Sequence, residues 1–361
     1  IVKSGKFGSQ EGTDHTAGIY VGGRGSGNHY AVRRIKVEGG WIYNLIGGPL
    51  TGNTRSSIND IYIYMTGGAV DVIIGGAGTS ATYGNRIIGV TGGVVNYSVF
   101  GGSNGYDGDD GDGTLNGSSF VYIGGNATIG NQTLINNDSK KWGAESGSVF
   151  GIGNGKSGTS EIGSNDNSNV MIDNMAVVLR NVYGGGNYGA TGVSSSSNTN
   201  TTNIYLNGGT INGSVYGGGN NNGAGSDTKT ATVNIVMTEG TVVGSVYGGS
   251  RTEGTIYGDT NVNIKSGTVS TSVYGGGEGG YTSASSPGTF VTGNVNVVIG
   301  EVGGSDSSVS IVGSVYGGSA FGSVNGGVND RNSTVTNKNT HVTVNAGSIG
   351  NVFGGGNEGQ E

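Results

Sequence analysis

Short runs of alternating apolar and polar residues recur along the whole chain, and most of them end in glycine. In the most regular copies, residues 233–249 and 262–276, an alternating run is followed by a polar turn containing glycine, a second short run, a tyrosine and two glycines. Alternation with a period of two predicts β-strands, because successive strand side chains point to opposite faces. The pattern therefore predicts many short strands joined by tight glycine turns.

The same frame can be followed through about eleven copies. Each copy is marked by an aromatic or aliphatic residue followed by glycine, and these anchors are Val21, Ile46, Ile74, Phe100, Phe150, Tyr183, Tyr216, Tyr247, Tyr274, Tyr316 and Phe353. Successive anchors lie about 25 to 50 residues apart, which is too irregular for a hexapeptide repeat but suits a three-sided β-helix with loops of variable length. We predict an all-β, right-handed parallel β-helix (β-solenoid) of about eleven irregular coils, forming a single domain over residues 1–361. Loop insertions from one corner are expected near residues 103–118, 187–202, 219–229, 277–293 and 318–339.

Stacked coils place equivalent residues about 4.8 Å apart in ladders. In the run Val233-Asn234-Ile235 the aliphatic residues should face the core and Asn234 should face outward, with Asn203, Asn263 and Asn296 at the matching position. A stacking ladder is expected at Tyr183, Tyr216, Tyr247, Tyr274, Tyr316 and Phe353. This ladder could form a flat strip for sugar rings or a neighbouring fibre, or a stack that stabilises the coils, and its place in the most regular copies favours the second interpretation. The glycines that follow the tyrosines break the alternation that would show which way the rings face.

The composition narrows the protein class. The chain has 81 glycines, 2 prolines and no cysteine, and only 11% of its residues are charged. Collagen would need proline and strict Gly-X-Y spacing, and a disordered chain would lack the β-branched and aromatic runs. A net charge of −7 without a basic cluster argues against nucleic acid, and the absence of a long apolar run argues against a membrane span. The missing cysteines exclude a disulfide scaffold and thiolate metal ligation.

One acidic loop could bind a metal ion. Residues 105–113 alternate glycine with Asp107, Asp109, Asp110 and Asp112, and carboxylates on a glycine-rich loop suit Ca²⁺. The spacing departs from the EF-hand order, so a solvated acidic loop is the alternative, and no cofactor is required. A weaker match to this pattern surrounds Asp166.

Enzymatic activity is not expected. Some parallel β-helices cleave polysaccharides, which would need paired carboxylates or a basic residue beside bound Ca²⁺. Neither arrangement stands out, and His15, His29 and His341 lie in separate polar contexts typical of surface residues. A carbohydrate-binding or carbohydrate-cleaving (polysaccharide lyase-like) β-helix with a metal site at residues 107–112 remains the alternative hypothesis.

The two ends suggest a partner. Residues 2–8 resemble the middle of a coil, and the last coil ends in residues 353–356 without a covering helix. Solenoids normally protect their terminal strand edges. We therefore expect the ends to continue into the rest of a longer solenoid or into another copy, through end-to-end or lateral assembly.

The repeats also carry a family resemblance. With its SVYGG-type repeats, VNI strands and Asn/Gly/Ser loops, the chain resembles the glycine-rich β-solenoid regions of large bacterial surface and secreted proteins, including autotransporter-passenger and filamentous-haemagglutinin-like adhesins. This resemblance covers nearly the whole chain and implies a stalk, adhesin segment or self-assembling fibre subunit outside the cell or on the bacterial surface. Host or biofilm glycans would then be possible partners. The resemblance implies no particular functional residue.

Overall fold

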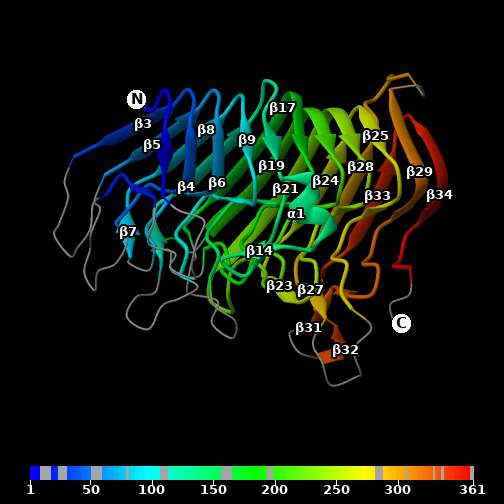
Figure 1. The fold of residues 1–361 in the computed structure, drawn as a ribbon. Helices are drawn as coiled ribbons and strands as arrows, with labels where there is room; N and C mark the ends of the chain where they lie inside the picture. Colours follow the sequence, from blue (N-terminus) through cyan, green and yellow to red (C-terminus); the bar gives the residue numbers. More distant parts are fainter. Residues whose placement is uncertain are drawn as a thin grey trace.

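A computed structural model describes most of the chain as a stack of coils, with the N-terminal coil at one end and the C-terminal coil at the other (Figure 1). The described residues are 1–8, 18–22, 31–49, 59–78, 81–105, 113–155, 165–192, 197, 199–280, 288–305, 308–327, 330–334 and 337–357. Among them, 25 strands form one sheet in which every pairing is parallel. This topology confirms the predicted parallel β-helix.

Three ladders of parallel strands make up the large sheet. The first contains β3 (Arg33–Val37), β5 (Ile61–Met65), β8 (Arg86–Val90), β12 (Ser119–Ile123), β17 (Ser168–Val178), β19 (Thr199–Ile211), β21 (Thr230–Val242), β24 (Thr260–Ile264), β28 (Val295–Ile299) and β33 (Thr340–Val344). The second contains β1 (Lys6–Phe7), β4 (Trp41–Ile46), β6 (Ala69–Ile74), β9 (Val94–Val95), β13 (Thr128–Ile129), the ends of β17, β19 and β21, then β25 (Gly267–Val269), β29 (Val309–Tyr316) and β34 (Ser348–Phe353). The third contains β2 (Ile19–Tyr20), the ends of β4 and β6, then β10 (Val99–Phe100), β16 (Val149–Phe150), β18 (Val182–Tyr183), β20 (Val215–Tyr216), β22 (Val246–Tyr247), β26 (Val273–Tyr274) and the ends of β29 and β34.

A fourth, short ladder runs along the corner where loops were expected. It contains β7 (Thr82–Tyr83), β11 (Leu115–Asn116), single bridges at Asn165, Thr191 and Ala224, and then β23 (Gly254–Ile256), β27 (Thr289–Val291) and β30 (Ser323–Val324). The expected loops at 103–118, 187–202, 277–293 and 318–339 are therefore partly strand. A hairpin of β31 (Gly326–Gly327) and β32 (Asp330–Thr334) follows β30.

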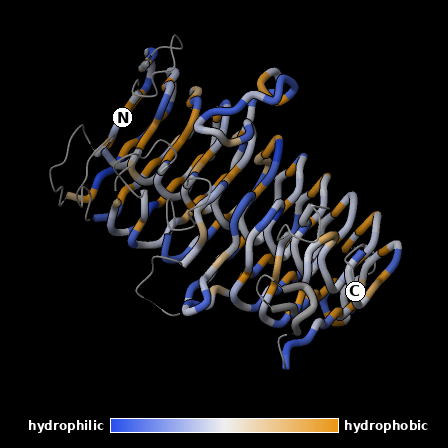
Figure 2. The backbone as a smooth tube through the Cα atoms, turned by 90° about the horizontal axis from the view of Figure 1, so that it is seen from below, coloured by the Kyte–Doolittle hydropathy of each residue, from blue (hydrophilic) through white to orange (hydrophobic). Residues whose placement is uncertain are grey.

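Alternation places aliphatic residues inside the coils, as in β5, where Ile61, Ile63 and Met65 are buried between partly exposed tyrosines. The resulting core is one continuous cluster that runs along the stack from Val37 to Val315. Figure 2 shows the hydrophobic positions recurring from coil to coil. Because each residue pairs with its equivalent on the next rung, burial is repeated rung by rung, which is the physical basis of solenoid stability.

Glycine is required at two places in the coil. In the turn from the first to the second ladder, Gly40, Gly68 and Gly93 have φ of 81°, 82° and 81°, a conformation that disfavours a Cβ. Directly after the third-ladder strand, a Cβ on Gly217 or Gly248 would overlap the carbonyl oxygen of the equivalent glycine on the next rung. The glycine that ends each repeat thus lets neighbouring rungs approach to hydrogen-bonding distance.

The register corrects two predicted alignments. In the first coil, Tyr20 pairs with Ile46, so the anchor is Tyr20 and not Val21, which lies one residue further along. In the coil of β24, Asn261 pairs with both Asn234 and Asn296, whereas Asn263 lies beside Val236 and Val298. The Asn263 alignment was wrong by two residues, and a two-residue shift keeps every side chain on the same face, so the alternation alone could not detect it.

One insertion leaves the repeat completely. Between β13 and β16 the chain forms α1 (Gln132–Asn136) and a hairpin of β14 (Lys140–Lys141) and β15 (Ala144–Glu145). Asn131 caps the helix by accepting a hydrogen bond from the Thr133 backbone N–H at 3.0 Å. The insertion lies against the outside of the coils (Figure 1) and covers residues that would otherwise face solvent.

Candidate functional site

Eight aromatic rings form one continuous stack along the third ladder. Adjacent rings lie with centroids 4.7–5.1 Å apart and planes within 12° of parallel, in the order Phe100, Phe150, Tyr183, Tyr216, Tyr247, Tyr274, Tyr316 and Phe353. The spacing is that of the rungs, because each ring is fixed to a strand that pairs with the next. The six predicted ladder residues all belong to this stack, which also includes Phe100 and Phe150.

The rings face away from the valine core but are covered. In each Val-Tyr pair the valine belongs to the central core, whereas the tyrosine belongs to a second cluster that includes Trp142 and Ala144 of the insertion and Ala320 of a later loop. Tyr183 is 1% exposed and Tyr247 is 8% exposed. The rings of the inner rungs are therefore not available as a flat stacking surface for sugars, whereas Phe353 on the last described rung is 44% exposed.

A charged network lies over the tyrosine hydroxyls. Arg251 Nη1 lies 3.3 Å from Glu145 Oε2 of the insertion and 3.3 Å from the Tyr183 hydroxyl, and its Nε lies 3.8 Å from Glu278 Oε2. The Tyr216 hydroxyl donates to Glu278 Oε2 at 2.5 Å. Burial raises the pKa of the Tyr183 and Tyr216 hydroxyls well above the usual value, so both remain protonated.

The network joins the insertion to the coils. Arg180 Nη1 also contacts Glu145 Oε2 at 3.3 Å, and its Nη2 contacts Asp138 Oδ1 at 2.9 Å. Since Glu145 is shared by two arginines and Glu278 is shared by Arg251 and Tyr216, both carboxylates act as cross-links. They hold the insertion and a later loop against the aromatic stack.

Two ladders of asparagine amides run parallel to the aromatic stack. On the outer face of the first ladder, each amide donates at 2.9–3.0 Å to the amide on the neighbouring rung nearer the N-terminus. The row runs in the order Asn296, Asn261, Asn234, Asn203 and Asn169. A second, largely buried row follows the glycines of the third ladder at 2.8–3.0 Å, in the order Asn220, Asn187, Asn154 and Asn104. Arg251 donates to Asn220 at 3.3 Å, so the buried row ends at the charged network.

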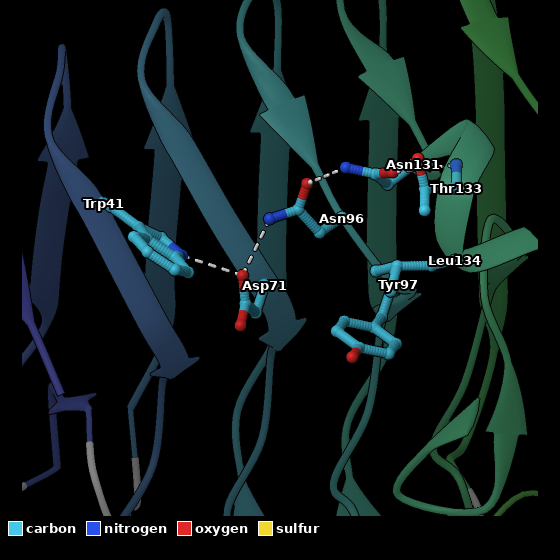
Figure 3. A pocket seen from close by; sticks show the side chains of 7 residues that line it. All are labelled: Trp41, Asp71, Asn96, Tyr97, Asn131, Thr133 and Leu134. Atoms are coloured by element: carbon cyan, nitrogen blue, oxygen red, sulfur yellow. Dashed lines mark hydrogen bonds between the residues drawn. The ribbon is translucent and has the colours of Figure 1, made fainter. Parts of the chain in front are cut away.

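The insertion also encloses a small cleft against the second ladder (Figure 3). Trp41 Nε1 and Asn96 Nδ2 each donate to Asp71 Oδ1 at 2.8 Å, and Asn131 Nδ2 donates to Asn96 Oδ1 at 3.2 Å. On the other side of the carboxylate, Lys141 Nζ of the hairpin lies 3.6 Å from Asp71 Oδ2.

Lys141 is held in an aromatic cage. Its Nζ lies 3.4 Å from the centroid of the Tyr43 ring and 5.3 Å from that of Tyr97, and it donates to the Tyr43 carbonyl at 3.0 Å. Burial lowers the pKa of Lys141 to about 8, while the adjacent Asp71 acts in the opposite direction. None of these residues was a predicted site residue, because they come from coils and an insertion that are far apart in sequence.

The predicted acidic loop, with Asp107, Asp109, Asp110 and Asp112, lies outside the described residues, as do His15 and His29. Within the described ranges, no group of three or more histidine or acidic side chains could hold a metal ion. Asn165, beside the weaker match at Asp166, is a fully buried member of the fourth ladder. His341 is exposed on β33, where it continues the outer row after Asn296.

The fold and its covered aromatic stack define the chain as a parallel β-solenoid. No family model, no curated protein and no solved structure matches the chain. Among the described residues, no helix has the length and apolarity needed to span a bilayer.

Proposed function

We propose that this protein is a structural and adhesive β-solenoid, acting outside the cell or on a bacterial surface as a segment of a large adhesin or as a subunit of a self-assembling fibre. The observation that supports this most is the continuity of the ladders, since backbone, aromatic and amide rows all run along one axis from rung to rung. Such rows give a rod in which the stacked side chains hold adjacent rungs in register.

The edge of the last described rung indicates what a further rung would contact. Of the residues that the structure describes, none covers the outer side of β33 and β34, where Val344, Val352 and Phe353 are each 44–48% exposed. On inner rungs the equivalent positions pair with a following strand. A further β-solenoid rung, from another copy or from more of the same protein, would complete the hydrogen bonds and continue the aromatic stack.

Negative-stain microscopy of the purified chain tests the assembly. End-to-end stacking is expected to give filaments with an axial repeat on the order of 50 Å, from about eleven rungs of about 4.8 Å each. Monodisperse short rods at high concentration would contradict self-assembly of this chain. Release of unsaturated sugars from acidic polysaccharides would overturn the structural proposal in favour of a lyase.

A further inference from the structure

The cleft beneath the insertion has the dimensions and construction of a small-ligand site. Its volume is about 310 Å³, at the small end of the range for ligand pockets and suited to a single small ring. It lies where Trp41 of β4, Asp71 of β6, and Asn96 and Tyr97 after β9 meet α1 (Figure 3). The site is thus made by three successive coils of the second ladder and the only described helix.

Its walls combine apolar and polar groups. Trp41, Tyr97 and Leu134 provide apolar surface, whereas Asp71, Asn96 and Asn131 provide oxygens and amide groups. The polar side chains are fixed before any ligand arrives, because the hydrogen bonds from Trp41 and Asn96 to Asp71, and from Asn131 to Asn96, form one chain. Asp71 is only 2% exposed, so its orientation is determined by the protein and not by solvent. Preorganised polar groups beside an aromatic wall lower the free-energy cost of binding a ligand that has both an apolar face and polar groups.

The charges favour a neutral ligand. Asp71 is already balanced by Lys141, and the Nζ of Lys6 lies 4.5 Å from the centroid of the Trp41 ring. The Asp71–Lys141 pair has no net charge and selects neither a cation nor an anion, and the charge of Lys6 is screened because that residue is exposed to solvent. A sugar ring fits this wall, since its C–H face packs on an aromatic ring and its hydroxyls can donate to and accept from amides and can donate to carboxylates.

We propose that this cleft binds one neutral sugar residue of a glycan. The ring packs against the aromatic wall, and its hydroxyls contact Asn96 and Asn131, which the buried Asp71 helps to hold in place. This site deepens the adhesive part of the proposed function by giving it a ligand class. Microscopy of filaments does not report on the site, so the failure of one proposal leaves the other standing.

Binding can be followed with the full chain through tryptophan fluorescence. The chain has two tryptophans, and Trp142 is buried beside the aromatic stack and does not line the cleft. In the Trp142→Phe variant, the remaining signal comes from Trp41. Neutral methyl glycosides of common hexoses and N-acetylhexosamines are titrated, with choline and acetate as charged probes and saturation-transfer NMR as a second readout.

We expect at least one neutral glycoside to give a saturable change, with Tyr97→Ala weakening it tenfold or more. If Tyr97→Ala fails to fold, Leu134→Arg takes its place as the test variant. Leu134 lies on α1, so the larger side chain fills the cleft without changing a strand and should abolish the signal. Tyr64→Ala, an exposed tyrosine on another ladder, is the matched control and should bind as the parent does. The absence of saturable binding for every neutral glycoside at about 10 mM, stronger binding of choline or acetate, or unchanged binding by Leu134→Arg would each overturn the proposal.

Discussion

Two glycines at the same position of the repeat should respond very differently to alanine. Gly248 and Gly354 both follow the third-ladder aromatic residue, and neither has a positive φ. A Cβ on Gly248 would overlap the Gly275 carbonyl oxygen and lie 3.0 Å from Gly275 C and 3.2 Å from Thr260 Cβ. A Cβ on Gly354 would meet no described atom within 4 Å. The pair therefore separates the effect of a neighbouring rung from that of losing a glycine.

The expected cost at Gly248 follows from these contacts. Overpacking of this kind costs about 1–3 kcal/mol, and pushing the rungs apart also weakens the 2.9 Å hydrogen bond from Gly248 N–H to the Tyr274 carbonyl, worth about 1 kcal/mol. We expect Gly248→Ala to lower the free energy of unfolding by about 3 kcal/mol. With an unfolding entropy of about 2.1 cal/mol/K per residue, a chain of 361 residues would lose roughly 4 °C in Tm. Gly354→Ala should stay within about 0.5 kcal/mol of the parent.

Thermal melts by circular dichroism, at a dilution where the parent is monomeric, measure both variants. Equal Tm values for Gly248→Ala and the parent would refute the claim that close rung approach requires glycine. A loss in Gly354→Ala as large as that in Gly248→Ala would refute the claim that the last rung is open. If copies stack end to end, Gly354→Ala should also raise the concentration needed for filaments while leaving the monomer intact.

Three further predictions concern the ladders and the insertion. Asn234→Ala removes one donor and one acceptor of the outer amide row and should lower the free energy of unfolding, measured with denaturant, by about 2 kcal/mol. Asn263→Ala should cost clearly less, because Asn263 lies between valines in that ladder. Equal losses for the two variants would contradict the amide ladder. Burial raises the folded-state pKa of Tyr183 and Tyr216, so their contribution to folding stability is complete below about pH 10 and is lost above it. The variant with both tyrosines replaced by phenylalanine should therefore show a smaller fall in Tm between about pH 10 and 11.5 than the parent. The same change of Tm with pH in both proteins would refute the assignment. The folded-state pKa of Lys141 is lowered to about 8, so the unfolded chain binds more protons than the folded chain between about pH 8 and 10.4, and the stability contributed by this group should rise across that range. Lys141→Met should remove that rise. The same dependence of stability on pH in the variant and the parent would contradict this prediction.

The sequence could predict the solenoid because its information is repeated. An alternating strand is ambiguous by itself, but the same order of strand, turn, strand, aromatic and glycines in copy after copy allows only stacked coils. The aromatic row was predictable for the same reason, since stacking follows from equal positions on paired strands. Its orientation was not predictable, because the cover over Tyr183 and Tyr247 comes from an insertion and loops that obey no repeat.

Register was the weaker part of the prediction. The frame Val262-Asn263-Ile264 matches Val233-Asn234-Ile235 in sequence, yet the structure pairs Ile235 with Val262 and Asn234 with Asn261. Both alignments bury the same kinds of residue, and both would give a continuous row of asparagines. They differ in the spacing to the second ladder, because seven residues separate Asn234 from Thr241 and Asn261 from its partner Thr268, whereas only five separate Asn263 from Thr268. The length of the turn between two strands can therefore determine register where hydrophobic alternation leaves two solutions.

The candidate chemistry lies where the repeat is broken. Arg251 and Glu278 occupy the place that asparagine holds on earlier rungs, four residues after the aromatic anchor, and this exchange creates the charged network. The cleft likewise depends on an insertion whose Lys141 reaches the carbonyl of Tyr43, 98 residues away in sequence. Contacts of this kind carry no periodic signal, so one sequence cannot reveal them. In a solenoid the regular residues build the rod, and the departures from the repeat are the first places to search for what the rod binds.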